Sequence, residues 1–77
     1  MLIEVFGSGC AKCETLVKHA KAAGEQSGKA FEVVKVSDFS VMAARGILST
    51  PALAVDGKVK FQGKVASSAE ILDLLQV

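Results

Sequence analysis

One junction limits the fold of this chain more than any other feature: its apolar pattern changes from strand to helix across Gly7–Gly9. Leu2–Phe6 before this connection has the pattern of a short strand, apolar apart from Glu4. From Cys10 to about Gln26, apolar residues recur every three or four positions, which is typical of a helix with one buried face. That apolar face consists of Cys13, Leu16, Val17, Ala20 and Ala23. The chain therefore begins with a strand that leads directly into a helix.

The remaining elements follow from β-branched runs, turn residues and helix caps. A strand at Phe31–Val36 is followed by a short helix, which Ser37-Asp38 caps and Gly46 stops. Two strands, Ala52–Val55 and Lys58–Gln62, flank the hairpin pair Asp56-Gly57. A last helix begins at Ser67, where Ser67 and Glu70 have capping-box spacing. The order is β-α-β-α-β-β-α. The first two strands should be parallel and the last two antiparallel. We expect an α/β fold with a four-stranded mixed sheet and helices on both faces.

The size and charge of the chain exclude several classes of protein. Seventy-seven residues allow one domain, which we expect to span residues 1–77. No run approaches the ~18 apolar residues of a transmembrane helix, and the first residues have no signal-peptide pattern, so we expect a cytoplasmic protein. The net charge of +1, without a basic run, predicts neither nucleic acid nor a membrane as a partner.

The chemistry is predicted by Cys10 and Cys13, the only cysteines. A disulfide across so short a loop would stabilise the fold little, so the pair is expected to be catalytic or metal-binding. At a helix start, Cys10 would meet unpaired amides that favour the thiolate, the nucleophilic form. Cys13 falls on the apolar face and should be more buried. We therefore expect Cys10 to attack a substrate disulfide and Cys13 to resolve the mixed disulfide. Lys12 adds a cation at the helix entry.

Two other uses of the cysteine pair have to be weighed. A zinc site usually has four ligands, whereas this chain adds only His19, expected on the solvated outer face of the helix. A soft-metal carrier of the copper-chaperone type is the main alternative, because it too has CxxC between a strand and a helix. Such carriers run β-α-β-β-α-β and usually have a Met where this chain has Ser8. A third possibility, an adaptor that binds without turnover, leaves the intact cysteine pair unexplained.

The motifs together resemble those of the compact thioredoxin-like proteins of archaea and bacteria, often described as small redox-active disulfide proteins. The resemblance runs from Leu2 to about Leu75, and its motifs are Gly7–Cys13, Gly46–Leu53, Asp56–Val59 and Gly63–Val65. It implies that Cys10 is the attacking cysteine, that Pro51 is cis and faces the disulfide, and that the Thr50 backbone pairs with an extended substrate segment. We assign Lys12 to substrate binding with these two residues.

The resemblance also implies partners and departs from ordinary thioredoxin at two places. We expect a monomer that exchanges protein disulfides, receives electrons from an upstream thiol reductase, and uses no bound cofactor or metal. Ser8-Gly9 stands where thioredoxin has a Trp before the first cysteine, and Ala11-Lys12 replaces Gly-Pro. The aromatic docking surface should therefore be reduced.

Glu4 is a further candidate catalytic residue. It lies six residues before Cys10, the spacing at which thioredoxins carry a buried carboxylate beneath the second cysteine. A carboxylate there would accept the proton of Cys13 during resolution. The alternative is a strand residue whose carboxylate simply reaches solvent.

Overall fold

The computed structural model describes residues 1–7 and 11–75. Its helices and strands follow the predicted order. They are β1 (Leu2–Phe6), α1 (Ala11–Ser27), β2 (Glu32–Val36), α2 (Phe39–Ala44), β3 (Ala52–Val55), β4 (Lys58–Gln62) and α3 (Ser68–Leu75). The expected α/β class with a four-stranded mixed sheet is confirmed.

The sheet has the order β2-β1-β3-β4, so β1 and β3 are its central strands. β1 pairs in parallel with β2 and antiparallel with β3, and β3 and β4 form the expected antiparallel hairpin. The hairpin turn has positive φ at both Asp56 (50°) and Gly57 (88°). Both angles are those of a type I′ turn, whose twist matches that of the flanking strands. The Asp-Gly pair therefore sets this turn as predicted.

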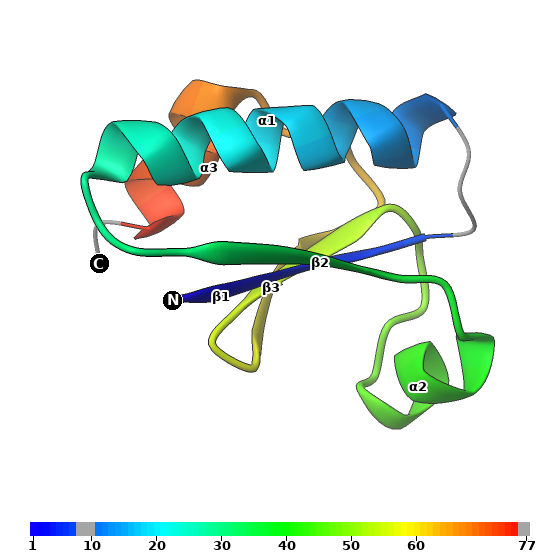
Figure 1. The fold of residues 1–77 in the computed structure, drawn as a ribbon. Coiled ribbons are helices and arrows are strands. Elements are labelled where there is room, and N and C mark those ends of the chain that lie inside the picture. Colours follow the sequence, from blue (N-terminus) through cyan, green and yellow to red (C-terminus); the bar gives the residue numbers. More distant parts are fainter. Residues whose placement is uncertain (8–10, 76–77) are drawn as a thin grey trace.

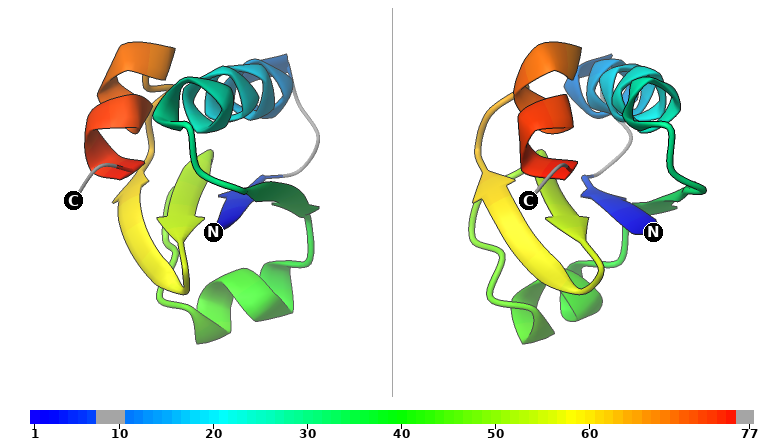
Figure 2. Two further views of the ribbon diagram at one scale, coloured as in Figure 1. Left: turned by 60° about the vertical axis from the view of Figure 1, so that its left-hand side comes forward. Right: turned by 90° about the vertical axis from the view of Figure 1, so that its left-hand side faces the viewer.

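The helices cover the sheet unequally (Figures 1 and 2). α1 and α3 lie side by side on one face, above the sheet in Figure 1, and α2 lies on the other face. Ile3 and Val5 of β1 belong to the larger core under α1 and α3, whereas Phe6 belongs to a smaller core with Met42 of α2. Successive residues of β1 thus alternate between two apolar layers.

Gly24 lies inside the first helix, because α1 continues to Ser27. A Cβ at Gly24 would lie 2.6 Å from the Phe31 ring, so the missing side chain makes room for that ring. Phe31 itself precedes β2, which begins at Glu32. Gly28 follows the end of the helix, and its φ of +72° suits a glycine at that position.

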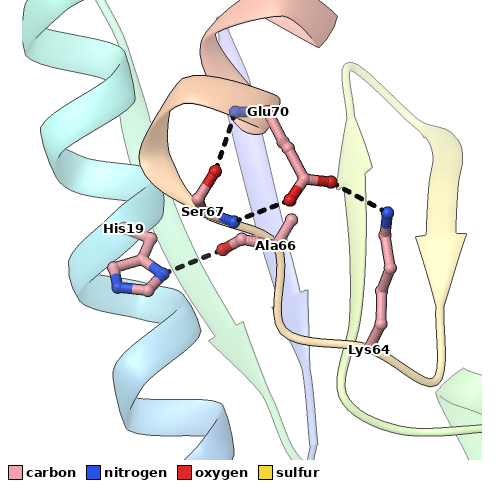
Figure 3. Close-up of polar contacts among 5 residues, drawn as sticks. All are labelled: His19, Lys64, Ala66, Ser67 and Glu70. Carbon is pink, nitrogen blue, oxygen red and sulfur yellow. Dashed lines mark hydrogen bonds and ion pairs between the residues drawn. The ribbon is translucent and has the colours of Figure 1, made fainter.

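The start of α3 confirms the predicted capping box (Figure 3). The Glu70 N–H donates to Ser67 Oγ at 3.2 Å, and the Ser67 N–H approaches Glu70 Oε1 at 3.5 Å. Lys64 Nζ lies 3.0 Å from the same carboxylate. The hydrogen bonds from Lys64 and from the Ser67 backbone lower the pKa of Glu70, in that order of size. The cap is therefore an ionised carboxylate at neutral pH.

His19 is partly buried rather than simply solvated, which corrects the expectation for this residue. Its Nδ1 lies 2.8 Å from the Ala66 carbonyl oxygen (Figure 3). A carbonyl only accepts hydrogen bonds, so Nδ1 must carry the proton. His19 therefore ties α1 to the segment that leads into α3.

Candidate active site

Cys13 lies in the first turn of α1 and is completely buried. Its sulfur rests against the backbone at Gly7, the residue that follows β1. A Cβ added at Gly7 would overlap Cys13 Sγ, because the two atoms would be far closer than non-bonded atoms can approach. The glycine is thus needed for the sulfur to sit over the end of β1, and the expected burial of Cys13 is observed.

The Gly7 backbone is itself fixed. Its N–H donates to the Val36 carbonyl oxygen at 2.9 Å, which extends the parallel pairing of β1 and β2 by one residue. The backbone that Cys13 Sγ contacts is therefore held by the hydrogen bonds of the sheet.

Pro51 directly precedes β3, at the end of the sheet where β1 leads into Gly7. The last paired positions of β1 and β3 are Phe6 and Ala52, so Gly7 and Pro51 come next at the same end of the two central strands. The Thr50-Pro51 peptide bond is cis, as the resemblance implies. Pro51 is buried, whereas Thr50 is exposed. The fold thus brings Cys13 and the Thr50-Pro51 peptide to one end of the central strands.

The remaining cysteine, Cys10, lies outside the described residues. In the sequence it directly precedes Ala11, the first residue of α1, and stands three positions before Cys13. Lys12 is exposed in the first turn of that helix.

The structure does not bring Glu4 to Cys13. Glu4 shares the α2 side of β1 with Phe6, whereas Cys13 lies on α1, which covers the opposite side. Both carboxylate oxygens of Glu4 lie 3.2 Å from guanidinium nitrogens of Arg45. The side chain of Glu4 is 15% exposed, so it is neither beneath the cysteine nor simply in solvent. This placement gives no support to a role as the base for Cys13.

Arg45 was not singled out by the sequence analysis. It is the C-cap residue of α2, and besides holding Glu4 it donates to the Gly57 carbonyl oxygen at 3.1 Å. Its guanidinium also lies 5.3 Å from the centre of the Phe6 ring. A lone carboxylate on an apolar strand requires a partner when it is partly buried, and Arg45 is the only arginine in the sequence. The carboxylate on an apolar strand and the single arginine would together have indicated the Glu4–Arg45 ion pair.

Gln62 is the second residue that sequence reasoning missed. Its Oε1 accepts the N–H groups of Leu48 and Ser49, which precede Thr50. No sequence signal identifies this contact, because it joins the end of β4 to a loop through a side chain that otherwise resembles an exposed strand residue.

Two findings bear on other classes of site. Among residues 1–7 and 11–75, no three His, Cys, Asp or Glu side chains are grouped so as to hold a metal ion. In the same part of the chain, no helix has the length and apolarity needed to cross a bilayer.

A mixed sheet with the order β2-β1-β3-β4, a buried cysteine at the start of α1, and a cis Thr-Pro peptide at the start of β3 define the thioredoxin-like class of thiol–disulfide oxidoreductases. Comparison with known proteins agrees. The thioredoxin domain family matches residues 1–76. A thioredoxin of Methanothermobacter thermautotrophicus is 39% identical over 75 residues, which is 97% of each chain. A thioredoxin of Methanocaldococcus jannaschii is 37% identical over 76 residues, covering 99% of this chain and 87% of its own.

The chain therefore belongs to the thioredoxin family, and it is a thiol–disulfide oxidoreductase of the protein-disulfide reductase type. The copper-carrier alternative gains no support from these relatives, and the β-α-β-α-β-β-α order with its closing helix differs from the order of such carriers.

Proposed function

We propose that the chain reduces protein disulfides in two exchange steps through Cys10 and Cys13. The Cys10 thiolate attacks one sulfur of the substrate disulfide, forms a mixed disulfide, and releases the other substrate sulfur as a thiolate that takes up a proton. Cys13 then loses its proton and attacks Cys10 Sγ, which releases the second substrate thiol and leaves a Cys10–Cys13 disulfide. Two electrons pass to the substrate, and an upstream thiol reductase returns them.

The observation that carries this division of roles is the complete burial of Cys13. A sulfur enclosed between α1 and the sheet cannot approach a disulfide within a large protein. It can approach a sulfur three residues away on its own chain. Resolution is therefore the step that suits Cys13.

The first step suits Cys10 because it directly precedes α1 in the sequence. The first amides of a helix have no intrahelical partner, and together with the helix dipole they favour a thiolate. Lys12, exposed in the first turn, adds a positive charge nearby. A thiolate is the form that attacks disulfides, so these groups favour Cys10 as the nucleophile.

Substrate binding is assigned to Thr50, Pro51 and Lys12. Thr50 is exposed beside the start of β3, where its backbone is available to an added extended segment. Proline has no N–H and so offers no competing donor at position 51. We further propose that the chain acts in the cytoplasm as a monomer of one domain, without a bound cofactor.

A pulse of iodoacetamide on the reduced protein at neutral pH tests these roles. We expect Cys10 to be alkylated more than about tenfold faster than Cys13, because only a transient opening exposes a buried thiol. Peptide mass spectrometry gives both rates from one sample. The same pulse in strong denaturant is the control, and there the two rates should converge. Equal rates in the folded protein, or faster labelling of Cys13, would show that the roles are wrongly assigned.

A further inference from the structure

A single side-chain oxygen holds the segment that precedes Thr50. Gln62 Oε1 accepts the N–H of Leu48 at 2.7 Å and the N–H of Ser49 at 3.1 Å. Two consecutive amides converging on one acceptor fix both the position and the direction of the backbone, because each donor limits the rotation that the other would permit. Gln62 is the last residue of β4, so the anchor belongs to the sheet.

The other side of Thr50 is held as well. The Gly63 N–H donates to the Pro51 carbonyl oxygen at 2.9 Å. A Cβ built on Gly63 would lie 3.1 Å from the Ser49 Cβ, so the two backbones are close together. Thr50, between these fixed points, forms no backbone hydrogen bond with any residue in the described part of the chain. Among the described residues, the backbone groups of Thr50 therefore have no backbone partner, while the segments on both sides of it are fixed.

The anchored segment also displays an apolar side chain. Leu48 is 91% exposed, the highest value among the large apolar residues of the described chain. It lies two residues before Thr50, and its own amide is one of the two that Gln62 holds. The chain bends at Ser49 and Thr50, so Leu48 stays close to Thr50. Two residues span at most about 7 Å, so a polypeptide paired with the Thr50 backbone would have a side chain within reach of Leu48.

We propose that Gln62 is a positioning residue for disulfide exchange and that it presents Leu48 as an apolar contact to the substrate. The occupant is an extended polypeptide segment with an apolar side chain close to its half-cystine. This inference rests on the proposed function, since it concerns how the same site selects its substrate. It also explains how a chain without the Trp of ordinary thioredoxin retains an apolar contact at its docking edge.

The test compares two disulfides of different size. One is a peptide with an intermolecular disulfide and a Leu beside its half-cystine, and the other is hydroxyethyl disulfide, which has no backbone to pair with Thr50. The readout is the ratio of kcat/KM for the peptide to kcat/KM for the small disulfide. We expect Gln62→Ala to lower this ratio about tenfold, the effect of losing two modest hydrogen bonds. Gln62→Glu retains an acceptor oxygen and should restore most of the ratio.

Two further variants complete the design. Leu48→Ser should lower kcat/KM for the Leu-containing peptide and should have a much smaller effect on a peptide with Ser at that position. Gln26→Ala is the matched control, because Gln26 is an exposed glutamine on α1, remote in sequence from the anchor. Its ratio should equal that of the wild type.

The possible results distinguish a failure of this inference from a failure of the proposed function. Equal losses of Gln62→Ala on both substrates would indicate a merely structural role and overturn the inference. Equal ratios for Gln62→Ala and Gln62→Glu, or a Leu48→Ser variant that keeps its preference for the Leu peptide, would also overturn it. A wild-type protein inactive on both disulfides would instead contradict the proposed function.

Discussion

Replacing Cys10 with serine is expected to lower kcat/KM for a protein disulfide by at least about a thousandfold, equivalent to about 4 kcal/mol of transition-state stabilisation. A serine hydroxyl stays protonated at neutral pH and does not exchange with disulfides, so no mixed disulfide can form. The rate is measured as thiol release from a disulfide-bonded protein, with excess dithiothreitol as the electron donor and its uncatalysed reaction subtracted.

The control for this variant is its stability, because the change removes one sulfur and adds one oxygen next to a helix start. An unfolding midpoint close to that of the wild type would show that lost activity reflects lost chemistry. Activity within tenfold of the wild type in a folded Cys10→Ser protein would mean that another group attacks the substrate, and the proposed mechanism would fail.

The second large effect is expected from Gly7→Ala. Gly7 does not have a positive φ, so the cost is steric: the new methyl group would occupy the position of Cys13 Sγ. Either the first turn of α1 or the end of β1 must shift. Overpacking of this kind typically costs about 1–3 kcal/mol of unfolding free energy. We expect a loss toward the upper end of this range, measured by urea denaturation, together with slower disulfide exchange.

A double-mutant cycle isolates the contact between Gly7 and the sulfur. In a Cys13→Ala background the sulfur is absent, and the nearest remaining atom is the Cβ of residue 13 at 3.1 Å from the added methyl carbon. The cost of Gly7→Ala should fall by more than about 1 kcal/mol in that background, which exceeds the usual error of additivity. The same cost in both backgrounds would show that the sulfur is not what excludes a side chain at position 7.

Local sequence signals predicted the elements well where one residue type determines the local geometry. Asp56-Gly57 fixes a hairpin because both positions require positive φ, and Ser67 with Glu70 caps α3 through contacts within one turn. The role of Gly24 could not be predicted in this way. Its missing side chain makes room for the Phe31 ring, which lies outside the helix. That contact is tertiary and leaves no local pattern.

Glu4 shows a second limit of sequence reasoning. Alternation along β1 indicates that Glu4 and Val5 point to opposite sides, but β1 is central and covered on both sides. The pattern therefore cannot tell which side carries the cysteine helix. Spacing to Cys10 suggested the α1 side, whereas the carboxylate lies on the α2 side with Arg45. The packing of α1 and α2 on opposite faces of the sheet decides this question, and it is a tertiary feature.

The most direct test of the central claim is the identity of the intermediate that accumulates when Cys13 is replaced by serine. Without a resolving thiol, the first exchange should stop at a mixed disulfide between the substrate and this chain. The reduced Cys13→Ser protein is mixed with a disulfide-bonded protein, quenched in acid, and digested without reduction for mass spectrometry. The account predicts a stoichiometric adduct linked through Cys10, released by added dithiothreitol. An intact substrate disulfide and no adduct, in a folded variant, would contradict it.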